Sequence, residues 1–276
     1  MKQVVLITGC SSGIGRALSL RFQAEGFRVF ASARRPETLT GLKKTGVETL
    51  ALDVTDAATI KSAVEQVIGQ AGRIDYLVNN AGYGLMGPAA ELPIDEVRRQ
   101  FETNVIGALA LVQEVVPHMV KAGSGRIVNV SSVSGVLTTP FAGPYCASKA
   151  ALTALSDALR LELEPFGIKV ITVQPGGVVS KFGDTATVHA EQSVAGSSMY
   201  KNAADIIRDR AKKGQEGAMD SGEFARRMVL AVTMPTPPAV FRCGVNSVKL
   251  PGMKWALPVR FQDLILKRAF GLDRIK

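Results

Sequence analysis

The sequence predicts an α/β fold, in which a single doubly wound domain has a seven-stranded parallel sheet with helices on both faces. Short apolar segments rich in β-branched residues alternate with longer amphipathic segments, the pattern of parallel strands joined by crossover helices. Most of the short segments are continuously apolar, as strands buried on both faces must be. In chain order the predicted strands are Val4–Thr8, Arg28–Ser32, Glu48–Asp53, Tyr76–Asn79, Arg126–Ser131, Lys169–Gln174 and Ala239–Arg242. The predicted helices are Ile14–Glu25, Ala57–Ala71, Ile94–Lys121, Pro144–Pro165 and Glu223–Val232.

The chain divides into one long regular part and two irregular segments. No repeat or linker interrupts the alternation before about Gly176, so residues 1–248 are expected to form one domain. Within it, residues 176–222 are rich in Gly, Ser, Ala and charged residues and show no clear periodicity, which is typical of a lid or a disordered loop. Residues 249–276 form a basic C-terminal extension punctuated by proline.

Composition excludes several classes of protein. Of the 276 residues, 46% are hydrophobic and 21% are charged, which supports a large core and excludes a disordered or collagen-like chain. Three cysteines and two histidines are too few for a disulfide framework, a cysteine zinc site or a histidine-rich metal centre. No apolar run is expected to span a membrane, because Gln113 and Glu114 interrupt the most apolar helix. The first residues carry no signal-peptide cleavage site, so a reducing, cytoplasmic compartment is expected.

The net charge of +9 is concentrated at the C-terminus. Between Lys249 and Lys276 there are seven basic and two acidic residues, a net charge of +5. No helix combines a basic stripe with a recognisable nucleic-acid docking motif, so binding to DNA is not expected. The remaining explanations of the charge are an anionic ligand, a membrane surface or solubility alone.

A glycine-rich turn, TGCSSGIG over residues 8–15, follows the first strand and leads directly into the first helix. Gly9 suits a tight turn, Gly13 lets a pyrophosphate approach the backbone, and Gly15 lets the helix pack closely on the strand. The helix N-terminus also offers free N–H groups to phosphates. The turn therefore predicts dinucleotide binding, with a glycine-rich turn that binds no ligand as the alternative. The predicted contacts in this turn are Gly9, Ser11, Ser12, Gly13, Ile14 and Gly15.

The residues after the second strand indicate which dinucleotide is bound. A carboxylate there would bind the ribose 2′-hydroxyl of NAD, whereas an arginine suits the 2′-phosphate of NADP. The chain has Arg34 and Arg35 and no carboxylate, so NADP(H) is predicted; the alternative is that both arginines merely occupy a surface turn. At the end of the third strand, Asp53 is predicted to accept a hydrogen bond from the adenine amino group. A helix N-cap role for Asp53 or Asp56 is the competing interpretation.

Tyr145 and Lys149 lie one turn apart on the same face of a predicted helix. A free tyrosine has a pKa of about 10, too high for a general base at neutral pH. A neighbouring ammonium group stabilises the phenolate, so such a tyrosine can give a proton to a carbonyl oxygen or take one from an alcohol. Ser131 and Ser132 end the fifth strand, at the edge where parallel sheets bind ligands. Alone, the Tyr–Lys spacing is equally that of an ordinary surface pair.

Taken together, the motifs resemble those of the Tyr-dependent short-chain dehydrogenase/reductase family, in particular its hydroxysteroid/retinol dehydrogenase-like branch. The resemblance covers about residues 1 to 245 and implies a Rossmann fold. Its specificity comes from several motifs that occur in the family's order and at its spacings. They are the TGCSSGIG turn, Asn79-Asn80-Ala81-Gly82, Ser132 thirteen positions before Tyr145, the Tyr145/Lys149 pair, and Pro175-Gly176.

The resemblance assigns a role to each catalytic residue. It implies that Ser132, rather than Ser131, binds the substrate oxygen and that Tyr145 is the acid/base. Lys149 would hold the nicotinamide ribose hydroxyls and lower the pKa of the tyrosine. Asn104 would bend its helix and hold a relay water, although it could also be an ordinary polar residue in mid-helix. The further cofactor contacts that it implies are Val54, Asn80, Ala81, Gly82, Tyr145, Lys149, Pro175, Gly176, Val178 and Ser180.

These roles predict an enzyme in which NADPH delivers a hydride to a hydrophobic ketone or aldehyde (steroid, retinoid or lipid-like) while Tyr145 protonates its oxygen. The lid would face the substrate, or simply pack on the domain, with Phe182, Val188, Val194, Met199 and Tyr200. One alternative is a non-catalytic NADP-binding protein with an interaction or regulatory role, and another is a ketoacyl-thioester reductase. The resemblance also implies a homodimer or homotetramer formed through helices 94–121 and 144–165.

The C-terminal extension has an amphipathic pattern. If it is helical beyond Pro258, its residues Phe261, Leu264, Ile265 and Phe270 lie near one face. Basic residues and a tryptophan beside an apolar face are typical of a helix at a membrane surface, so weak peripheral membrane association is one hypothesis. The other is a terminal helix that packs over the substrate pocket or against a second subunit.

Overall fold

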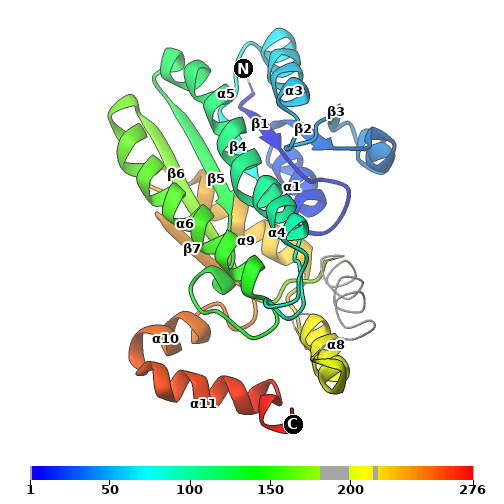
Figure 1. The fold of residues 1–276 in the computed structure, drawn as a ribbon. Helices are drawn as coiled ribbons and strands as arrows, with labels where there is room; N and C mark the ends of the chain where they lie inside the picture. The colour runs from blue at the N-terminus through cyan, green and yellow to red at the C-terminus, as the bar shows by residue number, and fades with distance from the viewer. Residues whose placement is uncertain (1, 181–198, 214–216, 276) are drawn as a thin grey trace.

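The central sheet contains seven parallel strands in the order β3-β2-β1-β4-β5-β6-β7 (Figure 1). The computed structural model describes residues 2–180, 199–213 and 217–275. Every predicted strand is present, with ends that differ from the prediction by at most two residues, so the doubly wound Rossmann architecture is confirmed. The strands are β1 (Val4–Ile7), β2 (Arg28–Ala33), β3 (Glu48–Ala51), β4 (Tyr76–Asn79), β5 (Gly125–Val130), β6 (Ile168–Pro175) and β7 (Val240–Cys243).

All five predicted helices are present, and the structure adds others. The predicted helix at Ile94–Lys121 is divided into two α-helical parts by a π-helical turn at Glu102–Ile106. A further helix begins directly after Pro258 and includes Phe261, Leu264 and Ile265, but it ends before Phe270, so the expectation that Phe270 shares their helix face is wrong. The helices are α1 (Gly13–Ala24), α2 (Thr40–Lys43), α3 (Ala57–Ala71), α4 (Ile94–Phe101), α5 (Gly107–Ala122), α6 (Gly143–Leu163), α8 (Ala204–Lys213), α9 (Ser221–Thr233), α10 (Lys249–Ala256) and α11 (Val259–Ala269).

The helix α8 lies in a segment for which the sequence predicts no regular structure. Of the side chains described in and just before this helix, only those of Ala203 and Ile207 are fully buried. Two buried positions are too few to produce a recognisable helical period, which is why the sequence pattern misses this element.

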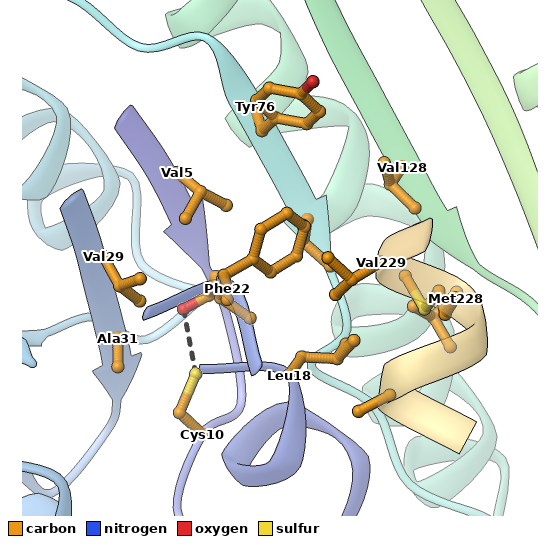
Figure 2. Close-up of a cluster of buried hydrophobic side chains, with 14 of the residues drawn as sticks. Val5, Cys10, Leu18, Phe22, Val29, Ala31, Tyr76, Val128, Met228 and Val229 are labelled. Carbon is orange, nitrogen blue, oxygen red and sulfur yellow. Dashed lines mark hydrogen bonds between the residues drawn. The ribbon is translucent and has the colours of Figure 1, made fainter. Parts of the chain in front are cut away.

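One face of the sheet is covered by α1 and α9. Figure 2 shows Leu18 and Phe22 of α1 beside Met228 and Val229 of α9, in one cluster with strand residues such as Val128. Phe22 is fully buried and its ring meets that of Tyr76 with 5.9 Å between centroids. Burial of large apolar side chains on both sides of the strands is the main favourable term in forming this layer.

The opposite face of the sheet is covered by α3, α5 and α6. Leu111, Val115 and Met119 of α5 are buried there, together with Leu6 and Leu77 from the strands. The continuously apolar strands thus supply side chains to two separate cores, as expected for a parallel sheet covered on both faces.

The segment Ile94–Ala122 corrects one expectation from the sequence. By length and composition alone it is long and apolar enough to cross a membrane, and it is the one such helix among the described residues. Its apolar side chains Leu111, Val115 and Met119 pack on the sheet. Packing on the sheet therefore explains part of its apolar character.

The segments that follow β6 and β7 meet at the carboxyl edge of the sheet. Gly177 and Val245 form an antiparallel bridge, and a Cβ atom on Gly176 would lie 2.0 Å from the carbonyl oxygen of Val245. Figure 1 shows α8, α10 and α11 on this side of the molecule, beyond the ends of the strands. The last elements of the chain are therefore placed at the edge where α/β proteins bind their ligands.

The buried position of Phe22 gives a direct test of this packing. Phe22→Ala removes a fully buried ring from the α1 layer and is expected to lower the free energy of unfolding by about 3–5 kcal/mol. Leu230→Ala on α9 is the control, because Leu230 is 64% exposed and should lose about 1 kcal/mol or less. Urea denaturation measures both, and similar losses for the two variants would contradict the assignment of the core.

Candidate active site

The glycine-rich turn is held against the end of β4 at very short range. Gly9 has a φ of +71°, and a Cβ atom on Gly15 would lie 2.4 Å from the carbonyl oxygen of Gly9. The side-chain amide of Asn80 donates hydrogen bonds to the carbonyl oxygens of Thr8 (2.9 Å) and Gly9 (3.2 Å), and the backbone N–H of Ala81 donates to the hydroxyl of Thr8 (2.9 Å). Asn80 therefore braces the turn, and glycine is needed where the backbones meet.

The turn fits a phosphate group. Gly13 begins α1 with a φ of +53°, and Ser12, the N-cap residue, makes no side-chain cap within the part of the chain described. The first N–H groups of the helix are thus available to an anion. A Cβ atom on Gly13 would lie 2.8 Å from that of Ser180, so the segment after β6 reaches this turn.

Cys10 lies inside the turn but is not suited to thiol chemistry. Its side chain is fully buried and its Sγ donates to the carbonyl oxygen of Ile7 at 3.2 Å (Figure 2). Burial raises the pKa of this thiol to about 11, so it stays protonated at neutral pH.

Arg34 and Arg35 are both exposed and follow β2 at the carboxyl edge. The N–H of Cys10 donates to the carbonyl oxygen of Ser32 at 2.9 Å, which holds the end of β2 beside the glycine-rich turn. Arg34 lies close enough to Tyr83 for its charge to act on that side chain. Burial raises the pKa of Tyr83, and the positive charge of Arg34 opposes this rise. The arginine pair is thus placed next to the segments that carry the other predicted dinucleotide contacts.

The two aspartates near β3 have different local partners. Asp56 is the N-cap of α3 and accepts a hydrogen bond from the N–H of Ala58 at 2.9 Å. The carboxylate of Asp53 instead accepts from the N–H and the hydroxyl of Thr55, at 3.0 and 2.8 Å. The N-cap role therefore belongs to Asp56, and the predicted contact between Asp53 and adenine stays a prediction. The neighbouring Val54 is buried against the start of α5.

Tyr145 and Lys149 are both buried in the first turns of α6. The ammonium group of Lys149 donates to the carbonyl oxygen of Val130 at 2.7 Å. Because burial disfavours the charged form, it lowers the pKa of Lys149 from 10.5 to about 8. A cation with a perturbed pKa one turn from a tyrosine is the arrangement expected of an acid–base site.

The two serines at the end of β5 have different surroundings. The hydroxyl of Ser131 donates to the carbonyl oxygen of Lys149 at 2.8 Å and lies 2.8 Å from the hydroxyl of Thr153. The Oγ of Ser132 accepts from the N–H of Ser134 at 3.1 Å, which leaves its own proton able to donate. Ser131 thus fixes the helix, and Ser132 retains the donor that a substrate oxygen would need.

Asn104 lies in the π-helical turn and is held on both sides. Its Oδ1 accepts from the N–H of Tyr83 at 3.1 Å, and its Nδ2 donates to the carbonyl oxygen of Tyr83 and to Ser148 Oγ, each at 3.0 Å. A Cβ atom on Gly82 would lie 2.9 Å from Asn104 Oδ1 and 3.5 Å from Lys149 Nζ. The structure therefore brings Asn104, Gly82 and Lys149 together.

The side chain of Tyr145 is part of an apolar cluster. Tyr200, the second tyrosine of this cluster, meets Phe141 edge-on with 5.9 Å between ring centroids, whereas Met199 is 74% exposed. Phe141 has a φ of +59°, which is uncommon for a bulky residue. The cluster consists of Met86, Phe141, Ala142, Tyr145, Cys146, Ala203 and Ile207, with Tyr200, Ile206, Leu272 and Ile275 packed against it.

Several members of this cluster were not predicted from the sequence. Phe141 stands four residues before Tyr145, a spacing that could have placed it near the tyrosine, while Met86 and Leu272 carry no comparable signal. Of the residues predicted for the lid, Tyr200 reaches the cluster. Phe182, Val188 and Val194 lie outside the described residues.

Comparison with known proteins gives consistent relatives. The profile of the short chain dehydrogenase family matches residues 3–191. A short-chain dehydrogenase/reductase of Pestalotiopsis microspora is 34% identical, covering 100% of this chain and 96% of that protein. The 3-ketodihydrosphingosine reductase of Bacteroides thetaiotaomicron is 40% identical, covering 67% and 68%. The NADPH-dependent 1-acyldihydroxyacetone phosphate reductase of Schizosaccharomyces pombe is 43% identical, covering 65% and 61%.

Solved structures show the same fold. A short-chain dehydrogenase from Streptomyces avermitilis superposes with a TM-score of 0.82 and 32% identity, covering 98% of this chain and 97% of that one. The closed form of a serine dehydrogenase complexed with NADP+ has a TM-score of 0.76 and 25% identity, covering 88% and 94%.

The buried ammonium group predicts a pH dependence of stability. The pKa of Lys149 is about 8 in the folded protein and 10.5 when the group is unperturbed, so between these values the unfolded chain binds more protons. Stability contributed by this group therefore rises with pH through that window. As the pH rises through this window, the free energy of unfolding of the unaltered protein should increase by up to about 3 kcal/mol more than that of the Lys149→Met variant. Urea denaturation on either side of the window measures this, and a difference that does not vary with pH would refute it.

Proposed function

The chain belongs to the short-chain dehydrogenase/reductase family, and from that premise we propose that it is an NADPH-dependent enzyme that reduces a hydrophobic ketone or aldehyde to an alcohol. The observation that carries the proposal is the position of Tyr145. It is buried one turn before Lys149 on α6, and its side chain belongs to the apolar cluster that contains Phe141 and Met86.

The residues around Tyr145 can carry out the acid–base half of the reaction. Ser132 donates a hydrogen bond to the substrate oxygen, keeps its own proton, and orients the carbonyl group. Tyr145 gives its phenolic proton to the same oxygen as negative charge develops there, and the ammonium of Lys149 stabilises the phenolate that remains. NADPH supplies the hydride when it is bound. Asn104 forms hydrogen bonds with the backbone of Tyr83 and with the hydroxyl of Ser148. It thereby fixes the backbone next to Gly82, which lies close to the ammonium group of Lys149.

The preference for NADPH is supported by the arginine pair and by the glycine-rich turn. Arg34 and Arg35 are exposed at the end of β2, where a 2′-phosphate would lie, and a planar guanidinium group matches a phosphate in charge and shape. One relative is named as NADPH-dependent, and the serine dehydrogenase structure was solved with NADP+.

The substrate class is supported by the apolar cluster and by the names of two relatives. A 3-ketodihydrosphingosine reductase and a 1-acyldihydroxyacetone phosphate reductase both act, by name, on ketones that carry long acyl or alkyl chains. The cluster beside Tyr145 offers apolar side chains and the hydroxyl of Tyr145 itself. This combination suits a lipid-like carbonyl compound.

Tyr145→Phe tests the proposed acid. The variant keeps the ring that packs in the apolar cluster but cannot give a proton, so NADPH oxidation with a panel of hydrophobic ketones should fall by about 10²–10⁴-fold. NADPH binding, followed by fluorescence titration, should be nearly unchanged. Tyr200→Phe is the matched control and should keep most of the activity. If Tyr145→Phe reduced ketones as fast as the unaltered protein, the proposed mechanism would be wrong. If the unaltered protein bound NADPH tightly but reduced none of the ketones, a non-catalytic binding role would be favoured.

Arg34→Ser combined with Arg35→Ser tests the cofactor preference. Loss of charge-assisted hydrogen bonds to the 2′-phosphate should raise the KM for NADPH by about 10–100-fold, with little change for NADH. Arg98→Ser is the control, because Arg98 is exposed on α4 and pairs with Asp95. A uniform effect on both cofactors would show that the arginines do not discriminate between them.

A further inference from the structure

Helix α11 presents an apolar stripe to solvent. Phe261, Leu264 and Ile265 are 59%, 46% and 43% exposed, and with Arg268 they follow the spacing of a single helix face. On the opposite side Gln262 is buried, and its amide donates to the carbonyl oxygens of Lys254 (3.1 Å) and Leu257 (2.7 Å). The orientation of α11 is therefore fixed by its inner side, and its apolar residues face outward.

The sole tryptophan of the chain lies in the adjoining helix. Trp255 of α10 is 69% exposed, and the guanidinium group of Arg242 lies 5.1 Å from the centre of its ring. Arg242 is in turn held by Gln174 at 2.8 Å, so the ring is supported on one side while most of it remains accessible. Tryptophan in this setting is typical of a side chain at the boundary between water and hydrocarbon.

The charged residues of the extension differ from those elsewhere. In the rest of the protein arginines commonly pair with acidic neighbours, as Arg98 does with Asp95 and Arg226 with Glu223. In the C-terminal extension six exposed cations have no ion pair with any carboxylate among the described residues. They are Lys249, Lys254, Arg260, Lys267, Arg268 and Arg274.

We propose that this surface, the basic apolar face formed by Trp255, Phe261, Leu264 and Ile265 with the six cations, binds an anionic lipid bilayer. Exposed apolar side chains and exposed cations without ion pairs, both concentrated in the C-terminal extension, match the two layers of such a surface, the hydrocarbon boundary and the negative headgroups. A second copy of the same face is the poorer partner, because two basic surfaces would repel each other.

The helix that carries the basic apolar face is followed in the chain by residues that reach the candidate active site. After α11 the chain turns back, and Leu272 and Ile275 pack against the apolar cluster that contains Tyr145 and Phe141. A bilayer bound to α11 would therefore lie next to this cluster. Access of a lipid-like ketone from the bilayer rests on the proposed function, whereas binding to the bilayer does not.

The binding is tested with the full chain and two kinds of vesicle. Because Trp255 is the only tryptophan, its emission reports on this face alone. With vesicles of phosphatidylcholine and phosphatidylserine we expect a shift of the emission to shorter wavelength, quenching by brominated acyl chains and co-sedimentation. Vesicles of phosphatidylcholine alone, or added salt, should weaken all three signals because the headgroup attraction is electrostatic.

Variants identify the residues responsible. Leu264→Gln combined with Ile265→Gln should weaken partitioning by about tenfold or more, because binding scales with buried apolar area. Leu230→Gln is the control, since Leu230 is an apolar residue on α9 that is even more exposed, at 64%. Lys267→Gln combined with Arg268→Gln removes two of the six cations and should reduce the preference for the anionic vesicles by about tenfold or more. Thermal melting verifies that each variant is folded.

Three results would overturn the proposal. The first is an unchanged Trp255 emission with both kinds of vesicle. The second is equal loss of binding in Leu230→Gln and in the double variant of α11. The third is that the double variant of α11 changes from dimer to monomer in sedimentation equilibrium while its binding to vesicles is unchanged. That result would assign the face to a contact between subunits. Loss of ketone reduction with intact vesicle binding would contradict the proposed function and leave this proposal standing.

Discussion

The buried ammonium group of Lys149 is the constraint around which the site is arranged. A cation taken out of water costs free energy unless polar groups replace its hydration, and here the side chain is only 5% exposed. The carbonyl oxygen of Val130 accepts a hydrogen bond from the ammonium group of Lys149, and the backbone at Gly82 lies close to the same ammonium group. A ligand that brought hydroxyl groups to this position would recover part of the remaining cost. The lowered pKa of Lys149 and an affinity for polar ligands therefore have the same physical origin.

The position of that ammonium group depends on how α6 is attached to the end of β5. Ser131 binds the carbonyl oxygen of Lys149, and a Cβ atom on Gly135 would lie 2.7 Å from the carbonyl carbon of the same residue. Ser148, between the tyrosine and the lysine, links this helix to Asn104 in the π-helical turn. The π-helical turn is thus the place where the long helix Ile94–Ala122 is joined to α6, which explains why its regular geometry is interrupted there.

The sequence predicts the polar half of the site well because that half is built from the most regular elements. Strand ends, the glycine-rich turn and the Tyr–Lys spacing each follow from a short local pattern. The structure places Tyr145 and Lys149 one turn apart on α6 and attaches Ser131, the neighbour of Ser132, to the carbonyl oxygen of Lys149, while the catalytic roles stay predictions. The apolar half was largely missed. Phe141, Ile207 and Leu272 come from a loop, an isolated helix and the C-terminal end, and only tertiary packing brings them together. Likewise, the sequence pattern predicts an amphipathic α11 but not which of its sides faces the protein. That orientation is fixed by the hydrogen bonds from Gln262 to the carbonyl oxygens of Lys254 and Leu257.

The two halves are also constrained to different degrees, and this bears on how specificity arises. Around the glycine-rich turn, backbones approach so closely that a Cβ atom on Gly15 would meet neighbours at 2.4 and 2.5 Å, so almost any change of side chain there disrupts the site. Beside Tyr145, by contrast, Tyr200, Ile206 and Leu272 are only partly buried and lie outside the sheet. Substitutions at such positions cost little stability. The polar groups of the site are therefore held by the sheet and its adjoining helices, while the apolar cluster beside them takes part of its packing from the last elements of the chain.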